Sequence, residues 1–338
     1  MLSMDGARNG GGKPPTIRDV AARANVAFSS VSRVLSGHPD VSEKMRVRVT
    51  TAATELGYKP DFLAQSLRSG HTRTIGFALR DISNPLFANV ARRCERDLRR
   101  AGYSMIITSS DGDIAAEAEN LELFRERHVD AVIASLVSET APTTLQQLEQ
   151  PTVPLILLDR EVPSIKASAL LSDHYAGVRA AVDALLAAGH VRIALITGEL
   201  DVRSTRERVR AFDDAHAAAG IPTAPDLMIF GTFDSDFAEV EVHRLLALPD
   251  PPSAILTGGV GVTSGALLAL HHSGLSPETD IAVVALDEWP QFAALAPSIW
   301  SVHRDSDEMG AALAHLVLDA MGGAEPRMEI TPTEFHPR

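Results

Sequence analysis

The sequence predicts two structural classes in one chain: a small all-α head over residues 15–59 and an α/β body with parallel sheets over residues 74–338. Apolar residues recur at helical spacing in the head, whereas seven short apolar runs alternate with helical segments in the body. Charge is divided in the same way. Residues 1–70 carry ten Lys and Arg against six Asp and Glu, and the remaining residues carry 21 against 38. A basic head on an acidic body is typical of a protein that binds nucleic acid through its head.

Composition excludes several other classes. Apolar residues make up 45% of the 338, which is enough for a sizeable core. No run approaches the roughly 20 apolar residues that span a bilayer, and residues 1–14 lack a signal peptide's apolar segment and predict a flexible arm. Cys94 is the only cysteine, so no internal disulfide can form. We predict a cytoplasmic protein in which Cys94 is a core residue.

The head begins with Thr16 and, three residues later, Asp19, a variant of the capping box that predicts a short helix ending near Ala24. Asn25 follows, and asparagine tolerates the left-handed backbone of a tight turn. A second helix comes directly after this turn, and a third is expected over residues 42–56. The apolar residues expected to form the shared core are Ile17, Val20, Ala21, Ala24, Val31, Val34, Leu35, Val49, Ala52, Ala53 and Leu56.

Two short helices joined by a tight turn and followed by a third helix predict a helix-turn-helix head. The second helix of this motif presents its first side chains to the major groove of DNA. Phe28 and Ser29 lie in its first turn, and Arg33 lies one turn further on, where an arginine can pair with guanine through two hydrogen bonds. A three-helix cap with a solvated polar face is the alternative interpretation.

The stretch TIRDVAARANVAFSSVSRVLSGHPDVSEKMRVRVTTAATELGYKPDFLAQSLRSG, residues 16–70, resembles the DNA-binding head of the lactose-repressor (LacI/GalR) family of bacterial regulators, and the resemblance continues through the body. It implies that Phe28, Ser29 and Arg33 read bases. It also implies that five further residues contact the DNA backbone: Thr16, Ser30, Ser32, Ser42 and Met45. The chain departs from the family at Asn25, where glycine is usual, and at Ala27, where serine is usual and can cap the helix. Met45 lacks a hydroxyl group that could bond a phosphate.

Residues 60–73 are expected to form a hinge between head and body. A helix of barely two turns is marginal in water unless something holds it. The family resemblance implies that two such hinges pack together in the minor groove and that Leu67 wedges a base step open, which is a known way to kink DNA. The alternative is a linker whose leucine docks on the body.

The body contains seven expected strands, at residues 74–79, 104–109, 130–135, 154–159, 192–197, 253–258 and 281–286. Ligands of parallel sheets bind beyond the carboxyl ends of the strands. Carboxylates follow these ends at Asp81, Asp111, Asp159, Glu199 and Asp287, and would suit a ligand rich in hydroxyl groups. For Asp111 and Glu199 we prefer a role as a helix N-cap.

In its body the chain resembles the family's two-lobed effector domain, which is similar to periplasmic sugar-binding proteins. Three segments carry the resemblance: RDISNPLF, STRERVRAF and VVALDEW. Together with Asp159 from the strand-end pattern, it implies an effector site of nine residues: Arg80, Asn84, Leu86, Phe87, Asp159, Arg208, Phe233, Gly259 and Asp287. Gly259 and Val260 replace the family's usual Asn and Asp, which removes a polar ligand contact.

The segment STRE predicts that Ser204 caps the helix that carries Arg208. Arg206 and Arg210 would then point away from Arg208 and face solvent. Arg208, Asp159 and Asp287 would form a polar clamp able to hold hydroxyl groups or a carboxylate.

We therefore predict a DNA-binding transcriptional regulator, a repressor controlled by a small sugar-like or related metabolite. It would act as a homodimer on a pseudo-palindromic operator. The Gly-rich segment GGVGVTSGALLAL, residues 258–270, lacks the Gly-Lys-Ser/Thr of a phosphate loop. No metal-ligand spacing stands out, and no catalytic constellation is present. We accordingly expect no cofactor, no metal and no enzymatic activity. The alternatives are a solute-binding module without DNA function and an enzyme that uses the strand-end carboxylates.

Overall fold

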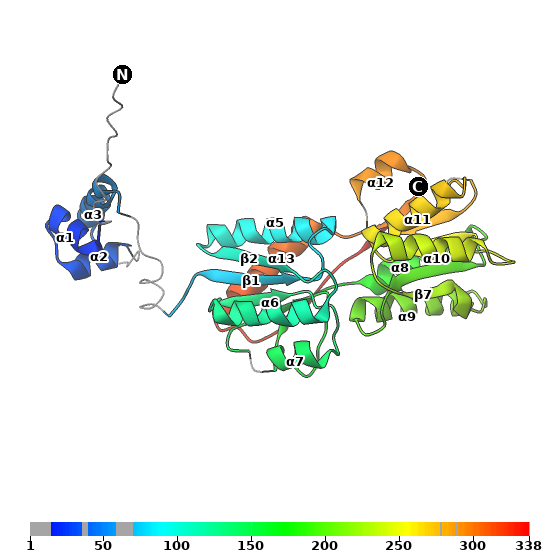
Figure 1. Cartoon of the computed structure of the whole chain (residues 1–338), viewed down its shortest axis with the longest axis horizontal. Coiled ribbons are helices and arrows are strands. Elements are labelled where there is room, and N and C mark those ends of the chain that lie inside the picture. The colour runs from blue at the N-terminus through cyan, green and yellow to red at the C-terminus, as the bar shows by residue number, and fades with distance from the viewer. Residues whose placement is uncertain are drawn as a thin grey trace, which may run out of the picture. The chain divides into compact units, whose positions relative to one another are not determined.

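The computed structural model describes residues 15–35, 40–58, 70–149, 151–277, 279–287 and 289–337. It divides the chain into two compact units, Met1–Thr72 and Arg73–Arg338. Figure 1 shows a helical first unit and a second unit that consists of two lobes. The expected arm over residues 1–14 and most of the expected hinge lie outside the described residues. Within the described ranges, no helix combines the length and the apolar character that crossing a membrane requires.

The head consists of α1 (Ile17–Ala24), α2 (Phe28–Leu35) and α3 (Glu43–Leu56). The predicted capping box is present, because Thr16 and Asp19 exchange hydrogen bonds at the start of α1. Asn25 ends this helix in the left-handed conformation, with φ of 48°. A core built from all three helices includes Val20, Val31 and Val49, each fully buried, as the helical spacing predicts.

Arg48 of α3 fixes the turn between the first two helices. Its guanidinium donates hydrogen bonds to the carbonyl oxygens of Ala24 (2.7 Å) and Asn25 (2.6 Å). The last carbonyl groups of a helix have no hydrogen-bond partner within the helix. An arginine can bond both of these because its charged guanidinium carries several N–H donors. The third helix therefore holds the turn that leads into α2.

The first lobe is built on a sheet of six strands in the order β11-β5-β4-β3-β1-β2, and all of its pairings are parallel. The strands are β1 (Thr74–Leu79), β2 (Ser104–Ser109), β3 (Ala131–Ala134), β4 (Leu155–Leu158), β5 (Ser168–Ser172) and β11 (Met328–Thr331). One face is covered by α5 (Pro85–Arg100) and α13 (Ser306–Met321), and the other by α6 (Ile114–Glu126) and α7 (Pro142–Leu148). Cys94 lies fully buried in the core under α5, as expected.

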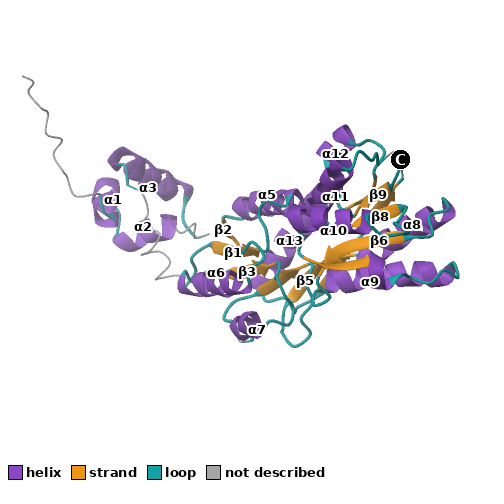
Figure 2. Cartoon of the chain, turned by 45° about the vertical axis from the view of Figure 1, so that its right-hand side comes forward, coloured by secondary structure: helices purple, strands orange, loops and turns teal. Residues whose placement is uncertain are grey.

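The second lobe repeats this plan, with the strand order β12-β10-β9-β8-β6-β7. The strands are β6 (Ile193–Gly198), β7 (Met228–Gly231), β8 (Ala254–Thr257), β9 (Ala282–Ala285), β10 (Trp300–His303) and β12 (Glu334–His336). Helices α8 (His174–Ala187) and α9 (Arg203–Ala218) cover one face, and α10 (Ser235–Leu246) and α11 (Val260–His272) cover the other. A short helix, α12 (Pro290–Leu295), follows β9. Figure 2 shows the strands enclosed between helices in both lobes.

All seven expected strands are present, and the structure adds β5, β7, β10, β11 and β12. The sheets are parallel as predicted, apart from one pairing at an edge. Strand β12 pairs with β10 in the antiparallel direction. It is a three-residue edge strand at the end of the chain, and an edge needs no crossover helix. The chain passes between the lobes three times: from β5 to α8, from β10 to α13, and from β11 to β12.

Candidate functional site

The exposed face of α2 carries the residues expected to read DNA. Phe28 is 48% exposed, and Ser29 and Arg33 are also exposed, whereas Val31 and Val34 on the opposite face are buried. The helix therefore has one face for the core and another that is open to solvent, as a helix that enters a DNA groove requires. Ser30 and Ser32 are half-buried beside it.

The residues expected to contact the DNA backbone differ in their exposure and in the hydrogen bonds that their side chains already make. The hydroxyl group of Thr16 donates to the Asp19 carboxylate (2.8 Å), and the hydroxyl group of Ser42 accepts from the backbone N–H of Met45 (3.4 Å). Both residues thus cap helices and stand at exposed helix N-termini, where anions are favoured. Met45 is half-buried and packs against the head core. Leu67 lies outside the described residues.

A cavity of about 400 Å³ lies between the two lobes. Eight of the nine expected effector residues line it: Arg80, Asn84, Phe87, Asp159, Arg208, Phe233, Gly259 and Asp287. Leu86 is the exception, because it is only 9% exposed and is not among the lining residues. Successive residues of a helix point about 100° apart, so Phe87 reaches the cavity while the preceding side chain turns inward.

Arg208 is held at the base of this cavity by the second lobe. Its side chain is nearly inaccessible, and its Nη1 donates to the Thr197 hydroxyl group (3.2 Å) and to the Gly258 carbonyl oxygen (2.7 Å). Burial lowers the pKa of the guanidinium to about 10, so the side chain stays charged at neutral pH. Two guanidinium groups approach the Phe233 ring. The guanidinium carbon of Arg208 is 5.9 Å from the ring centroid, and that of Arg80, from the other lobe, is 4.9 Å from it.

The strand-end aspartates are joined by an arginine that the sequence pattern did not reveal. Arg304 follows β10 and donates from Nε (2.8 Å) and Nη2 (2.6 Å) to the Asp287 carboxylate, and from Nη1 to the Asp159 carboxylate. Asp159 and Asp287 are therefore not free acceptors, as a simple clamp would require, but partners of one buried cation. The missed signal was a charged residue directly after a strand, the same position that singled out the aspartates.

His174 completes this charged group. It lies at the start of α8, fully enclosed, with Nε2 3.5 Å from an oxygen of Asp159. Burial, reinforced by Arg208 and Arg304 and only partly offset by Asp159, lowers the histidine's pKa to about 3. Burial alone would raise the pKa of Asp159, but Arg304 and the histidine outweigh it and hold that pKa well below its usual range. The group therefore contains a neutral imidazole at neutral pH.

The expectation that Ser204 caps α9 is wrong. The helix begins at Arg203 after Val202, which makes no side-chain cap bond, and Ser204 is buried inside the first turn. Glu139 of the first lobe takes the capping role instead, accepting from the backbone N–H of Arg203 (2.9 Å). Its carboxylate also accepts from Arg206 (2.7 Å), which is exposed as predicted but bridges the lobes.

The preferred capping roles of Asp111 and Glu199 are also wrong. Asp113 caps α6 by accepting from two backbone N–H groups, and Asp111 instead takes a left-handed conformation and lines the cavity. Glu199 is exposed and lies before the first turn of α9. Trp289 also lines the cavity and packs edge-on against Phe292, with ring centroids 5.2 Å apart.

Comparison with known proteins identifies the two parts separately. Residues 16–61 match the family model described as bacterial regulatory proteins, lacI family, and residues 182–338 match a periplasmic binding protein-like domain. The ribose operon repressor of Escherichia coli (strain K12) is 30% identical over 321 residues, which cover 94% of this chain and 97% of that protein. The chain belongs to the lacI family. It is a DNA-binding transcriptional regulator with an effector domain, not an enzyme.

Solved structures extend this likeness to the fold. A transcriptional regulator CelR–cellobiose complex is 29% identical and matches with a TM-score of 0.70 over 96% of this chain and 99% of that one. A lac repressor dimer bound to operator and the anti-inducer ONPF matches with a TM-score of 0.81 at 24% identity, over 96% of this chain and 98% of that one. The predicted head and two-lobed body are thus confirmed as the lacI-family architecture.

Proposed function

We propose that this lacI-family regulator is a homodimeric repressor of a pseudo-palindromic operator, and that a small polar metabolite bound between its lobes controls its affinity for DNA. The observation that carries the proposal is the inter-lobe cavity, in which a buried arginine of one lobe and a strand-end aspartate of each lobe converge. About 400 Å³ is within the range of cavities that enclose small ligands.

The chemistry of the lining supports a ligand rich in oxygen atoms. Arg80 and Arg208 supply charged donors, and the Phe233 ring, which both guanidinium groups approach, adds an apolar surface to the lining. Arg208 also has a buried Nε without a hydrogen-bond partner among the described residues, and such a donor costs about 1–3 kcal/mol. The expected ligand classes are sugars and their acidic or phosphorylated derivatives, because arginine binds hydroxyl, carboxylate and phosphate oxygens alike.

DNA binding is proposed for one face of the head. Phe28, Ser29 and Arg33 would contact bases, with Ser30 and Ser32 beside them on the phosphates. Thr16, Ser42 and Met45, at the starts of α1 and α3, would contact the sugar-phosphate backbone of the DNA. Leu67, in a hinge over residues 60–73, would act as the minor-groove wedge that the family resemblance implies.

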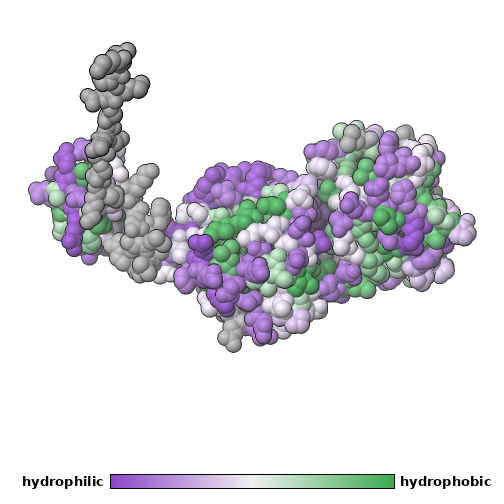
Figure 3. All heavy atoms as spheres, in the orientation of Figure 1, coloured by the Kyte–Doolittle hydropathy of each residue, from purple (hydrophilic) through white to green (hydrophobic). Residues whose placement is uncertain are grey.

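A second copy of the chain is the proposed partner of the first lobe. Figure 3 shows hydrophobic atoms gathered where α5 and β2 lie, and Ile107 on the edge strand β2 is 38% exposed. Ile82 and Ile114 are 49% and 39% exposed, and the Ile82 backbone N–H bonds Ser109 at the end of that strand. An exposed apolar patch beside a sheet edge is typical of a contact surface. We place the dimer in the cytoplasm, with its operator DNA.

The experiment is binding of the purified chain to labelled DNA from upstream of its own gene, at fixed salt, with and without candidate ligands. The panel contains D-ribose, cellobiose, sugar acids and sugar phosphates. The proposal predicts specific binding that at least one compound shifts. A protein that binds a compound tightly but prefers no DNA sequence would instead be a solute-binding module.

A further inference from the structure

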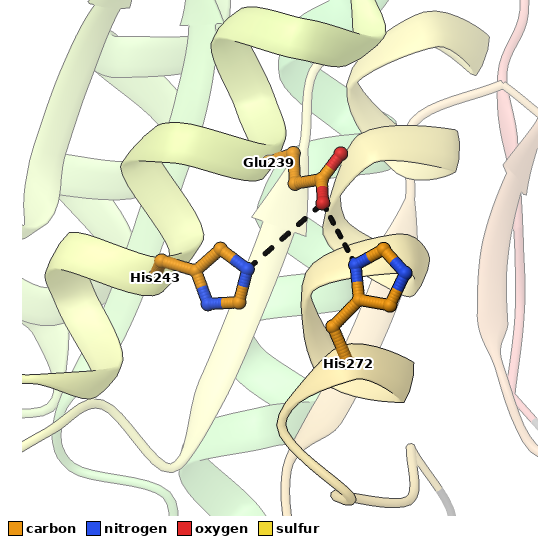
Figure 4. A group of neighbouring side chains, drawn as sticks. All are labelled: Glu239, His243 and His272. Carbon is orange, nitrogen blue, oxygen red and sulfur yellow. Dashed lines mark hydrogen bonds and ion pairs between the residues drawn. The ribbon is translucent and has the colours of Figure 1, made fainter.

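A second group of ligand-type side chains lies outside the effector cavity, between α10 and α11 of the second lobe. It consists of Glu239, His243 and His272, and one ligand atom from each lies within 4.8 Å of the others (Figure 4). Glu239 is half-buried, and the two histidines are exposed. The sequence gives no metal-type spacing here, because His272 comes from a different helix.

The positions of these residues follow from helix geometry. Glu239 and His243 are four residues apart on α10 and so lie one above the other on the same face. His272 is the last residue of α11 and faces the same carboxylate. Its Nδ1 lies 2.9 Å from Oε1 of Glu239, and Nε2 of His243 lies 3.9 Å from that oxygen.

These separations fit a transition metal ion. With Zn²⁺–nitrogen and Zn²⁺–oxygen bonds of about 2.0–2.1 Å at tetrahedral angles, neighbouring ligand atoms lie about 3.3 Å apart. The two observed distances lie on either side of that value. Small rotations of exposed side chains, which cost little, would bring all three ligand atoms to one ion.

One of the proposed ligands has a hydrogen-bond partner on its far side. The second ring nitrogen of His243, Nδ1, lies 3.4 Å from the hydroxyl oxygen of Ser273. A ligating histidine commonly donates its other N–H to a neighbouring oxygen, which selects the tautomer that leaves Nε2 free for the metal. Here that arrangement turns Nε2 toward Glu239.

The two helices that supply the ligands are also held closely together. A side chain at Gly265 of α11 would come within 2.1 Å of the backbone oxygen of Ser235 and within 2.9 Å of the backbone nitrogen of Glu239, both in α10. The absence of side chains lets the helices touch along their backbones. The ligands therefore project from a rigid pair, as a pre-organised metal site requires.

We propose that Glu239, His243 and His272 bind one divalent transition metal ion, Zn²⁺ in the first instance, with solvent completing its coordination. Two imidazoles and one carboxylate suit Zn²⁺ and disfavour Ca²⁺ and Mg²⁺, which prefer oxygen ligands alone. The ion would fasten α10 to α11. Both helices begin at the effector cavity, which Ser235 and Gly261 line, so the ion would stabilise the lobe that carries Arg208.

The test is calorimetric titration of ZnCl₂ into the full-length, untagged chain after removal of bound metal with a chelator. We expect one Zn²⁺ per chain at this site and a rise of a few degrees in the melting temperature. His243→Ala and His272→Ala should each abolish both effects. His271→Ala is the matched control, since this neighbouring exposed histidine lies outside the cluster and its loss should change neither.

Two further variants separate a metal site from a simple ion pair. Ser273→Ala removes only the group behind His243, and should weaken Zn²⁺ binding by about tenfold or more without altering the metal-free melting temperature. Glu239→Gln should weaken it as well, because a neutral amide is a poorer ligand. Absence of Zn²⁺ binding by the wild type, or equal binding by the wild type, His243→Ala and His272→Ala, would overturn the proposal.

Discussion

In the proposed function, Arg33 and Arg208 give one residue type two different purposes. Arg33 is exposed on α2, the helix proposed to read base edges. Arg208 is buried, and the fork of its guanidinium is fixed by a hydroxyl group and a carbonyl oxygen. Exposure permits recognition of a partner from outside, whereas burial pre-organises a donor for a ligand that enters the cavity.

Replacing Arg33 with alanine tests base reading. Loss of one bidentate contact should cost about 1–3 kcal/mol of specific binding per site and relax the preference at one base pair of each half-site. Binding to a set of operator variants measures both effects. An unchanged sequence preference would remove Arg33 from the base-reading residues.

The buried His174 predicts a pH effect on the stability of the body. Its pKa is about 3 in the folded chain and near 6.5 in the unfolded chain, so the unfolded state binds more protons between these values. Stability should therefore fall as pH drops below about 6.5, by about 2 kcal/mol between pH 8 and pH 5. Urea unfolding across this range checks it. In His174→Gln the fall should be smaller by that amount, and an unchanged profile would contradict the assignment.

At the scale of elements, the sequence correctly predicted those helices, strands and turns that depend only on neighbouring residues in the chain. The three head helices and seven apolar strands follow from periodicity, and Asn25 takes the left-handed turn that its side chain tolerates. The missed elements depend on distant neighbours. Strand β12 has three residues, and α9 is capped by Glu139, which lies in the other lobe. Eight cavity residues were expected, seven from the family resemblance and Asp159 from the strand-end pattern. Arg304 was missed because its partners come together only across a crossover.

The crossover after β10 depends on that arginine. In Arg304→Met, Asp159 and Asp287 remain buried without their cation, and we expect a loss of about 3–5 kcal/mol in the free energy of unfolding. Urea unfolding measures it, with Arg210→Met as control, because the exposed pair of Arg210 with Glu207 should contribute less than about 1 kcal/mol. Equal stability of the two variants would show that Arg304 does not hold the crossover together.

At the scale of the whole molecule, the chain couples two binding equilibria. A ligand can change DNA affinity only by as much as its own affinity differs between two states of the protein. The inter-lobe cavity is suited to such a difference, because its charged residues come from both lobes and from the segments that join them. Glu139 with Arg206 and Arg304 with Asp159 are contacts that a movement of the lobes would have to change.

The most direct test of this account is the DNA affinity of Arg208→Ala, with and without the compound that shifts the wild type. The head is a separate compact unit, so affinity without the compound should match the wild type. The response to the compound should disappear, because the cavity loses its buried donor fork. Arg210→Ala, altered at an exposed arginine of the same helix, should respond normally. If Arg208→Ala still responds at the concentration that shifts the wild type, the effector does not bind in the cavity described.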